Sequence, residues 1–112
     1  MKLKNEFKPI REWADSKGIY AKGDVKTQYV KLQEEAGELA KAIMKDDYEE
    51  FVDAIGDCVV VLVSIAELGN KHFNIQPFDK QLTIEECINT AYDVIAKRTG
   101  KMVNGTFVKD QD

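Results

Sequence analysis

Apolar residues recur at helical spacing along the first half of the chain. Residues 7–16 form a short amphipathic pattern, which predicts a first helix. From residue 25 to about residue 45 the apolar positions return every three or four residues. This predicts a long second helix, with Asp24 as its N-cap.

A third helical pattern follows directly. Asp47 can cap this helix, which we expect to end near Leu68 because Gly69-Asn70 is a good C-terminal stop. The β-branched run 59–63 would also suit a strand, but the length of the surrounding pattern favours a helix. Residues 71–82 have the character of a loop.

The last third of the chain holds a fourth helical pattern and a short extended tail. A Thr-x-x-Glu capping box at 83–86 starts a helix that reaches about Arg98. Residues 102–109 suit a short strand, or a hairpin that turns at Asn104-Gly105. The sequence therefore predicts an all-α bundle of about four helices with a short C-terminal extended segment, in a single domain over residues 1–112.

Composition favours a cytoplasmic globular protein. The net charge is −4 and the sequence pI is about 5.1, which argues against binding to a nucleic acid polymer. The longest apolar run, Cys58 to Val63, is too short to span a membrane, and the N-terminal residues lack the apolar stretch of a secretory signal. Cys58 and Cys87 lie inside helical patterns, where we expect buried thiols in a reducing compartment.

The third helix is apolar on nearly all sides from Cys58 to Ala66. A helix of this kind must be buried all round, and one chain of this length has limited core to bury it. We therefore expect oligomerisation, as a homo-dimer or homo-tetramer.

Acidic residues gather on two faces of the second and third helices. At about 100° per residue, each set falls within an arc of about 100° or less: Glu34, Glu35 and Glu38 on the second helix, and Glu50, Asp53 and Asp57 on the third. Consecutive antiparallel helices can bring two such faces together. Carboxylate oxygens are the ligands that magnesium prefers, often combined with substrate phosphates.

A solvated surface is the competing interpretation of these acids. It suits the second helix, where Lys31 and two further lysines can pair with the carboxylates. It suits the third helix less well, because the line through Asp53 and Asp57 continues into the apolar positions Val60 and Val61. A buried carboxylate needs a partner, and a metal ion is a good one.

The missing ligands narrow the choice of metal. His72 is the only histidine and belongs to no Glu-x-x-His pair, which argues against a di-iron or zinc site. Magnesium remains, and manganese can take its place. Phosphates then need side-chain partners, and Lys97, Arg98 and Lys101 could serve, although cations at a helix C-terminus also simply favour the helix dipole.

The segments KLQEEAGELAKAI and DAIGDCVVVL resemble the MazG-like, all-α NTP pyrophosphohydrolases, whose hallmark is EExxE followed after a spacer by ExxD. The tail AKRTGKMVNGTFVK is similar to that of short members encoded by bacteriophages. The resemblance implies hydrolysis of a nucleoside triphosphate, with deoxy forms included, to the monophosphate and pyrophosphate by metal-activated water.

The resemblance also implies roles for individual residues. It assigns metal ligation to Glu35, Glu38 and Asp57, and the ExxD glutamate aligns with Ala54, so that Asp53, one turn from Asp57, would take its role. Alternatively, Glu50 and Asp53 form the ExxD pair and Asp57 is an additional ligand. Glu34, beside these ligands, is the candidate to orient or deprotonate the water.

Five further residues are expected to bind substrate. Lys101 and Asn104 resemble the family's C-terminal Lys and Asn, at a spacing one residue shorter. Gln28 and Lys31 precede the acidic face by one to two turns. Trp13 could contact the base, although its helical spacing with other apolar residues favours a place in the core.

The alternative function is a non-enzymatic interaction module, in which the acidic faces only keep a helical oligomer soluble. It predicts no magnesium dependence and no loss of function when the third-helix aspartates are replaced by asparagine.

Overall fold

The computed structural model of the chain describes residues 1–76 and 81–110. Its elements, in chain order, are α1 (Lys8–Ser16), α2 (Ile19–Lys22), α3 (Val25–Met44), α4 (Tyr48–His72), α5 (Ile84–Ile95), β1 (Gly100–Val103) and β2 (Thr106–Lys109). The two strands pair as an antiparallel hairpin. The predicted all-α fold class with an extended C-terminal segment is confirmed.

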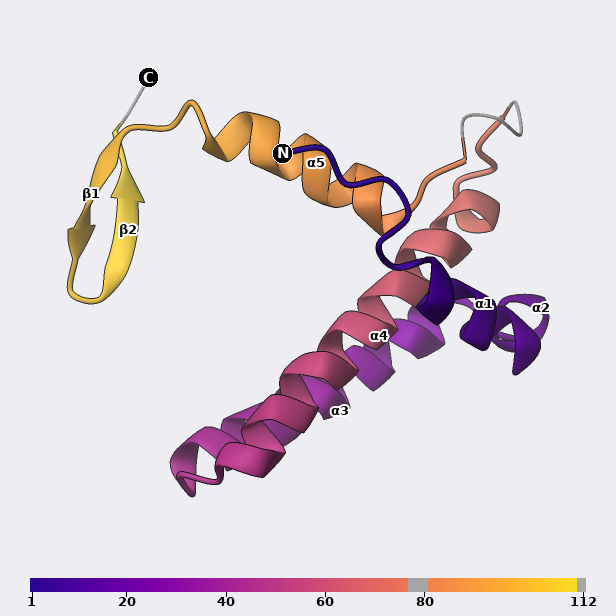
Figure 1. Ribbon diagram of the computed structural model, residues 1–112, viewed down its shortest axis with the longest axis horizontal. Helices are drawn as coiled ribbons and strands as arrows, with labels where there is room; N and C mark the ends of the chain where they lie inside the picture. The colour runs from indigo at the N-terminus through magenta and orange to yellow at the C-terminus, as the bar shows by residue number, and fades with distance from the viewer. Residues whose placement is uncertain (77–80, 111–112) are drawn as a thin grey trace.

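The long helices α3 and α4 run antiparallel and form the body of the molecule (Figure 1). The Asp24 carboxylate accepts a hydrogen bond from the Thr27 N–H at 2.7 Å, and the Asp47 carboxylate accepts one from the Glu50 N–H at 3.1 Å. Both predicted N-caps are therefore confirmed. Asp46, with φ of 54°, takes the left-handed conformation that lets the chain reverse between the two helices.

The predicted end of the third helix is wrong, because α4 continues through Gly69-Asn70 to His72. The Asn70 carboxamide donates to the Leu82 carbonyl at 2.9 Å and accepts a hydrogen bond from the Leu82 N–H. A Cβ atom at Gly69 would already touch the Leu82 side chain, at 4.0 Å. Gly69 and Asn70 thus serve to dock Leu82 against α4. They do not end the helix, although their sequence resembles a helix stop signal.

One other helix boundary and one additional helix differ from the sequence prediction. The fourth predicted helix, α5, ends at Ile95 and not near Arg98, so the basic residues that follow lie in the connection to the hairpin. The structure also contains α2, whose four residues are too few to leave a periodic pattern.

The core lies where α1 packs against the C-terminal half of α4. Ala14, Val63 and Leu68 are among the buried apolar residues there. The N-terminal half of α4 and the facing end of α3 are open, since Phe51 and Val52 are 39% and 52% exposed. Burial of the third helix on all sides does not occur within one chain, and the oligomerisation expected from its apolar faces stays a prediction.

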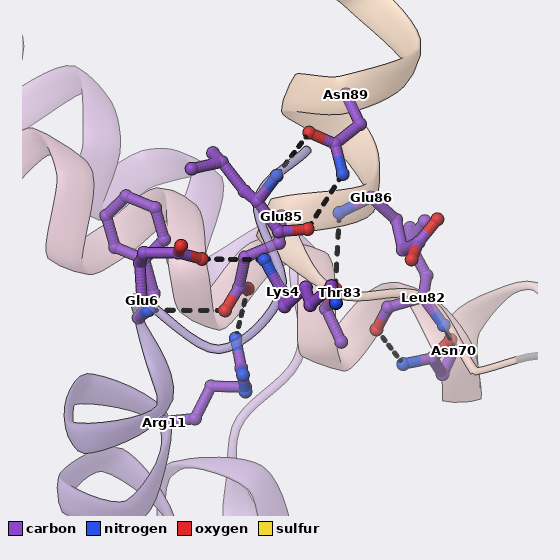
Figure 2. Close-up of polar contacts among 11 residues, drawn as sticks. Lys4, Glu6, Arg11, Asn70, Leu82, Thr83, Glu85, Glu86 and Asn89 are labelled. Carbon is purple, nitrogen blue, oxygen red and sulfur yellow. Dashed lines mark hydrogen bonds and ion pairs between the residues drawn. The ribbon is translucent and has the colours of Figure 1, made fainter. Parts of the chain in front are cut away.

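Buried polar contacts fix the start of α5 (Figure 2). The Glu85 carboxylate, 1% exposed, accepts hydrogen bonds from the Arg11 guanidinium and from the Phe7 N–H. The Asn89 carboxamide accepts from the Leu3 N–H and donates to the Leu3 carbonyl, both at 2.9 Å. We call these contacts of Glu85 and Asn89 the latch, because they tie α5 to the N-terminal segment and to α1.

Beyond the latch the chain projects away from the helix pair, as Figure 1 shows for the second half of α5 and the hairpin. We call residues 90–110 the arm; every one of them is exposed. Asn104 and Gly105, with φ of 49° and 83°, form the predicted hairpin turn. Among the elements described, β1 and β2 contact only each other.

Candidate active site

A cavity of about 440 Å³ opens between α1, α3 and α4. It combines an acidic and amide-bearing side with an apolar side, and its lining comprises Trp13, Ile19, Thr27, Gln28, Val30, Lys31, Glu34, Glu35, Asp57, Val60, Val61 and Ser64. A second hollow of about 380 Å³, lined by Pro9 and Ile10, shares Trp13, Asp57 and Val60 with it. Together they form a groove with carboxylates at one part and an aromatic wall at another.

Helical periodicity explains how α3 and α4 supply this lining. Gln28, Lys31 and Glu35 lie three and four residues apart, so they share one face of α3. On α4, Asp57 and Ser64 are two turns apart on the face that the antiparallel packing turns toward α3. The sequence-based inference that the Asp57 line continues into apolar positions is confirmed, since Val60 and Val61 line the same cavity.

Lys31 is the cation of this cavity lining, and two carboxylates hold it. Its Nζ lies 3.3 Å from Glu35 Oε1 and 3.5 Å from Glu34 Oε2. The Glu35 side chain is 14% exposed and that of Glu34 is 63% exposed, so Glu35 points inward and Glu34 stands at the mouth. The hydrogen bond to Glu35 is the main cause of a raised pKa of Lys31, which stays fully protonated.

The Asp57 carboxyl sits in an electrostatically unfavourable place. Burial raises its pKa above the usual range, and the charges of Asp53 and Glu35 raise it further. Glu35 also acts through a hydrogen bond to the protonated Asp57 carboxyl, while Lys31 opposes these effects. Burial and the neighbouring carboxylates of Asp53 and Glu35 thus disfavour the charged form of Asp57.

This pair fits a magnesium ion. Mg²⁺ commonly binds one or two protein carboxylates and completes its coordination with water and substrate phosphates. The open cavity beside Glu35 and Asp57 leaves room for such ligands. Within residues 1–76 and 81–110, no group of three or more His, Cys, Asp or Glu side chains is close enough to hold a metal alone. The arrangement therefore suits an ion that arrives with its phosphates.

The structure separates the remaining expected ligands from this pair. Glu38 pairs with Lys41 at 3.6 Å on the exposed side of α3. Glu50 and Asp53 do not line the cavity, and Asp53 acts on Asp57 through its charge alone.

The expected C-terminal contacts also lie elsewhere in a single chain. Lys97 and Arg98 lie in the connection after α5, and Lys101 and Asn104 lie in the hairpin. Figure 1 places this arm away from the α3–α4 pair that carries the cavity.

Trp13 lies on the cavity wall and is 49% exposed, so the inference that favoured the core for it is wrong. Its neighbour Ala14 takes the core position of α1. Sequence reasoning missed Thr27 and Ile19 as lining residues. Thr27 could have been found, because it lies one turn before Lys31 on the same face of α3.

These features define an all-α protein with an acidic cavity between two antiparallel helices, suited to a phosphate-rich ligand bound through a cation. Residues 24–103 match the model of the MazG nucleotide pyrophosphohydrolase domain. The chain belongs to this family, as the acidic motifs of α3 and α4 led us to expect.

A phage protein is also similar to this chain. The chain is 35% identical over 65 residues to a protein of Haemophilus phage HP1 (strain HP1c1), described as an uncharacterized 18.2 kDa protein in the rep-hol intergenic region. The match covers 58% of this chain and 40% of the phage protein, so the chain spans less than half of that relative's length. No solved structure matches the chain. Each helix that the structure describes is too short or too polar to cross a bilayer.

Proposed function

We propose that this protein is a magnesium-dependent nucleoside triphosphate pyrophosphohydrolase that converts (d)NTP to (d)NMP and pyrophosphate. The observation that carries the proposal is the cavity in which Glu35 and Asp57 meet beside Lys31 and an aromatic wall. Membership of the MazG family supports the reaction class. Manganese would replace magnesium, because it shares the preference for oxygen ligands.

The carboxylates of Glu35 and Asp57 would hold the cation at the inner part of the cavity. Magnesium, when bound, neutralises phosphate charge and lowers the pKa of a coordinated water. Lys31, already oriented by Glu34 and Glu35, would bind a phosphate oxygen as a second positive group. Glu38, Asp53 and Glu50 would contribute negative charge around the site without a direct place in the cavity.

Glu34 is the group we assign to water activation. It stands at the mouth of the cavity, 63% exposed, where solvent reaches it. The water oxygen forms a bond to the α-phosphorus while the bond from that phosphorus to the bridging oxygen breaks, and pyrophosphate leaves. The carboxylate of Glu34 takes the proton of the attacking water.

The aromatic side of the groove would receive the base. Trp13 presents a half-exposed indole, and base stacking on aromatic side chains contributes about 1–3 kcal/mol per base. Gln28 and Thr27, on the first turns of α3, offer hydrogen-bonding groups near that end. Stacking tolerates every base, so selectivity would rest on these few polar contacts.

We place the activity in the cytosol of the cell that expresses the protein, and in a homo-oligomer. Free Cys58 and Cys87 thiols support a reducing compartment.

The test is pyrophosphate release from a panel of NTPs and dNTPs, with magnesium and with EDTA, and with identification of the monophosphate. We expect Glu35→Gln to lower kcat/KM by at least about 100-fold. Glu49→Gln is the matched control, since this exposed glutamate lies in the first turn of α4 outside the cavity, and it should retain activity. Folded protein that releases no pyrophosphate from any nucleotide would refute the proposal and favour the interaction module.

A further inference from the structure

Ser64 is the most deeply buried polar residue of the cavity lining. Its side chain lines the cavity although the residue is only 1% exposed, whereas Thr27 is exposed and Gln28 is half-buried. A hydrogen bond to a buried group discriminates between ligands more strongly than one that water can replace. Ser64 is therefore well placed to distinguish one ligand from another.

The position of Ser64 along α4 suits contact with a base. It lies two turns after Asp57, about 10 Å further along the same face of the helix. Because α3 runs antiparallel to α4, Lys31 and Gln28 lead away from the carboxylates in the same direction. A nucleotide with its phosphates beside Asp57 thus extends its base toward Ser64.

The Tyr20 hydroxyl lies behind Ser64, outside the cavity lining. Its oxygen is shielded from solvent and, among the residues that the structure describes, is the one buried side-chain polar atom without a hydrogen-bond partner. Burial raises the pKa of Tyr20, and an interaction with the Ser64 hydroxyl is the main effect that opposes the rise. The two hydroxyls therefore face each other, short of a complete hydrogen bond in the free chain.

The backbone of α2 holds Tyr20 in this place. The Gly23 N–H donates to the Ile19 carbonyl at 2.7 Å, and a Cβ atom at Gly23 would lie 2.5 Å from that oxygen. Only glycine closes the turn after α2 this tightly. The turn sets Ile19 against the cavity and Tyr20 against α4, so the short helix serves to position a side chain beside the site.

The direction of the two O–H groups decides what Ser64 offers to a ligand. A serine in a helix often donates back to its own helix, as Ser16 does to the Trp13 carbonyl at 2.6 Å. Over the described part of the chain, Ser64 forms no such bond to its own helix. Because Ser64 Oγ is the acceptor that faces the buried Tyr20 O–H, Tyr20 donates to it, and the Ser64 O–H is left to donate into the cavity.

We infer that Ser64, oriented by Tyr20, selects nucleotides whose base carries a carbonyl oxygen at position 4 of a pyrimidine or position 6 of a purine. Uracil, thymine, guanine and hypoxanthine present this acceptor. Cytosine and adenine present an amino group there, which leaves the Ser64 O–H without an acceptor. Ser64 contacts the base and Tyr20 is a positioning residue. The inference rests on the proposed function, since it requires that the cavity bind a nucleotide.

The test compares nucleotides that differ in this group, UTP with CTP and ITP with ATP. We expect the wild-type kcat/KM to be at least about 10-fold higher for the carbonyl member of each pair, because a buried donor is left unmet in the other. Ser64→Ala should bring this ratio to about 2 or less by raising KM for UTP and ITP, with little change in kcat. Ser16→Ala is the matched control, since its exposed hydroxyl lies outside the cavity.

Tyr20→Phe separates a positioning role from a structural one. We expect the same fall in the ratio, an unchanged kcat and a urea midpoint that is equal or higher, because the variant removes a buried hydroxyl without a partner. A structural role predicts a lower midpoint and an equal loss of activity with all four nucleotides. Tyr48→Phe is the control, since Tyr48 is 77% exposed at the start of α4, outside the cavity, and it should change nothing.

Hydrolysis without a preference for UTP and ITP, or a preference that survives Ser64→Ala, would overturn the inference and leave the proposed function standing. A preference that survives Tyr20→Phe would overturn the positioning role. Calorimetric titration with UMP and with CMP, in magnesium, covers the case in which no nucleotide is hydrolysed. Tighter binding of UMP that Ser64→Ala abolishes would then uphold the inference against the proposed reaction, and the absence of selective binding would overturn both.

Discussion

Replacing Arg11 by methionine removes one member of the buried ion pair that joins α1 to α5. The Arg11 side chain is 14% exposed and its partner Glu85 is 1% exposed. Methionine keeps most of the aliphatic volume, so the change tests the charge and the hydrogen bond more than the packing. Glu85 would keep its hydrogen bond from the Phe7 N–H and lose its counter-ion.

From the structure we expect Arg11→Met to lower the free energy of unfolding substantially. Removal of one partner from a buried pair costs about 3–5 kcal/mol, and the partial exposure of Arg11 favours the lower end, about 3 kcal/mol. A domain of this size has a free energy of unfolding of roughly 6–17 kcal/mol, so the loss is a substantial share of the total. Because α1 carries Trp13, we expect the substrate affinity to fall as well.

The assay is urea unfolding followed by circular dichroism, with Lys8→Met as the matched control in the same helix. Lys8 pairs with Glu12 at 3.7 Å, but both side chains are more than 60% exposed. An exposed pair of this kind contributes about 0.5 kcal/mol or less. If Arg11→Met costs no more than Lys8→Met, the latch does not stabilise the fold as we argue.

The pH dependence gives an independent check on the same pair. Burial alone would raise the pKa of Glu85, but hydrogen bonds from Arg11 and from backbone N–H groups outweigh it and lower the pKa. The stabilisation is therefore present above the pKa of an unfolded glutamate, about 4.3, and is lost as the pH falls through the lower folded value. The stability difference between wild type and Arg11→Met should shrink over that range. A difference that does not change with pH would contradict the assigned role of the carboxylate.

Three further predictions concern the groove and helix α4 beside it. Asp57→Asn should lower kcat/KM by at least about 100-fold and, since it removes a carboxyl whose charged form burial, Asp53 and Glu35 disfavour, should raise the urea midpoint in the absence of magnesium; an active variant would refute its role. Gly56→Ala should stabilise the helix by about 0.5–1 kcal/mol, because a Cβ atom there meets nothing within 4 Å; a loss measured by urea unfolding would show that something approaches the backbone. Trp13→Ala should raise KM about 10-fold with a smaller change in kcat, and an unchanged KM for every nucleotide would place the base elsewhere.

The helix pair could be predicted because its determinants are local. Apolar spacing, the Asp24 and Asp47 caps and the turn residues lie close together in sequence. The same spacing places Glu35 and Asp57 on facing sides of the pair, and the structure brings these two to one cavity. The sequence alone could not show which carboxylate of the second helix points into the cavity. Glu35 and Glu34 differ in this respect through the exposure of their side chains, which depends on the packing of the helices.

The features that sequence reasoning missed depend on contacts between distant residues. Asn70 resembles a helix stop until its bonds to Leu82 are known. Trp13 fits a core pattern by spacing, yet the helix is oriented by the latch so that Ala14 turns inward. The position of Lys101 depends on the direction of the arm, which no local pattern encodes.

The latch also has a consequence for the order in which the chain acquires its structure. Leu3 and Asn89 are 86 residues apart in sequence, and Arg11 and Glu85 are 74 apart, whereas a short turn joins α3 to α4. The entropy of loop closure grows with the length of the loop, so distant pairings form after near ones. We expect a refolding chain to close its acidic helical hairpin first and to join its two ends later. The direction of the arm would then be set last, and subunits could associate only after that slow step.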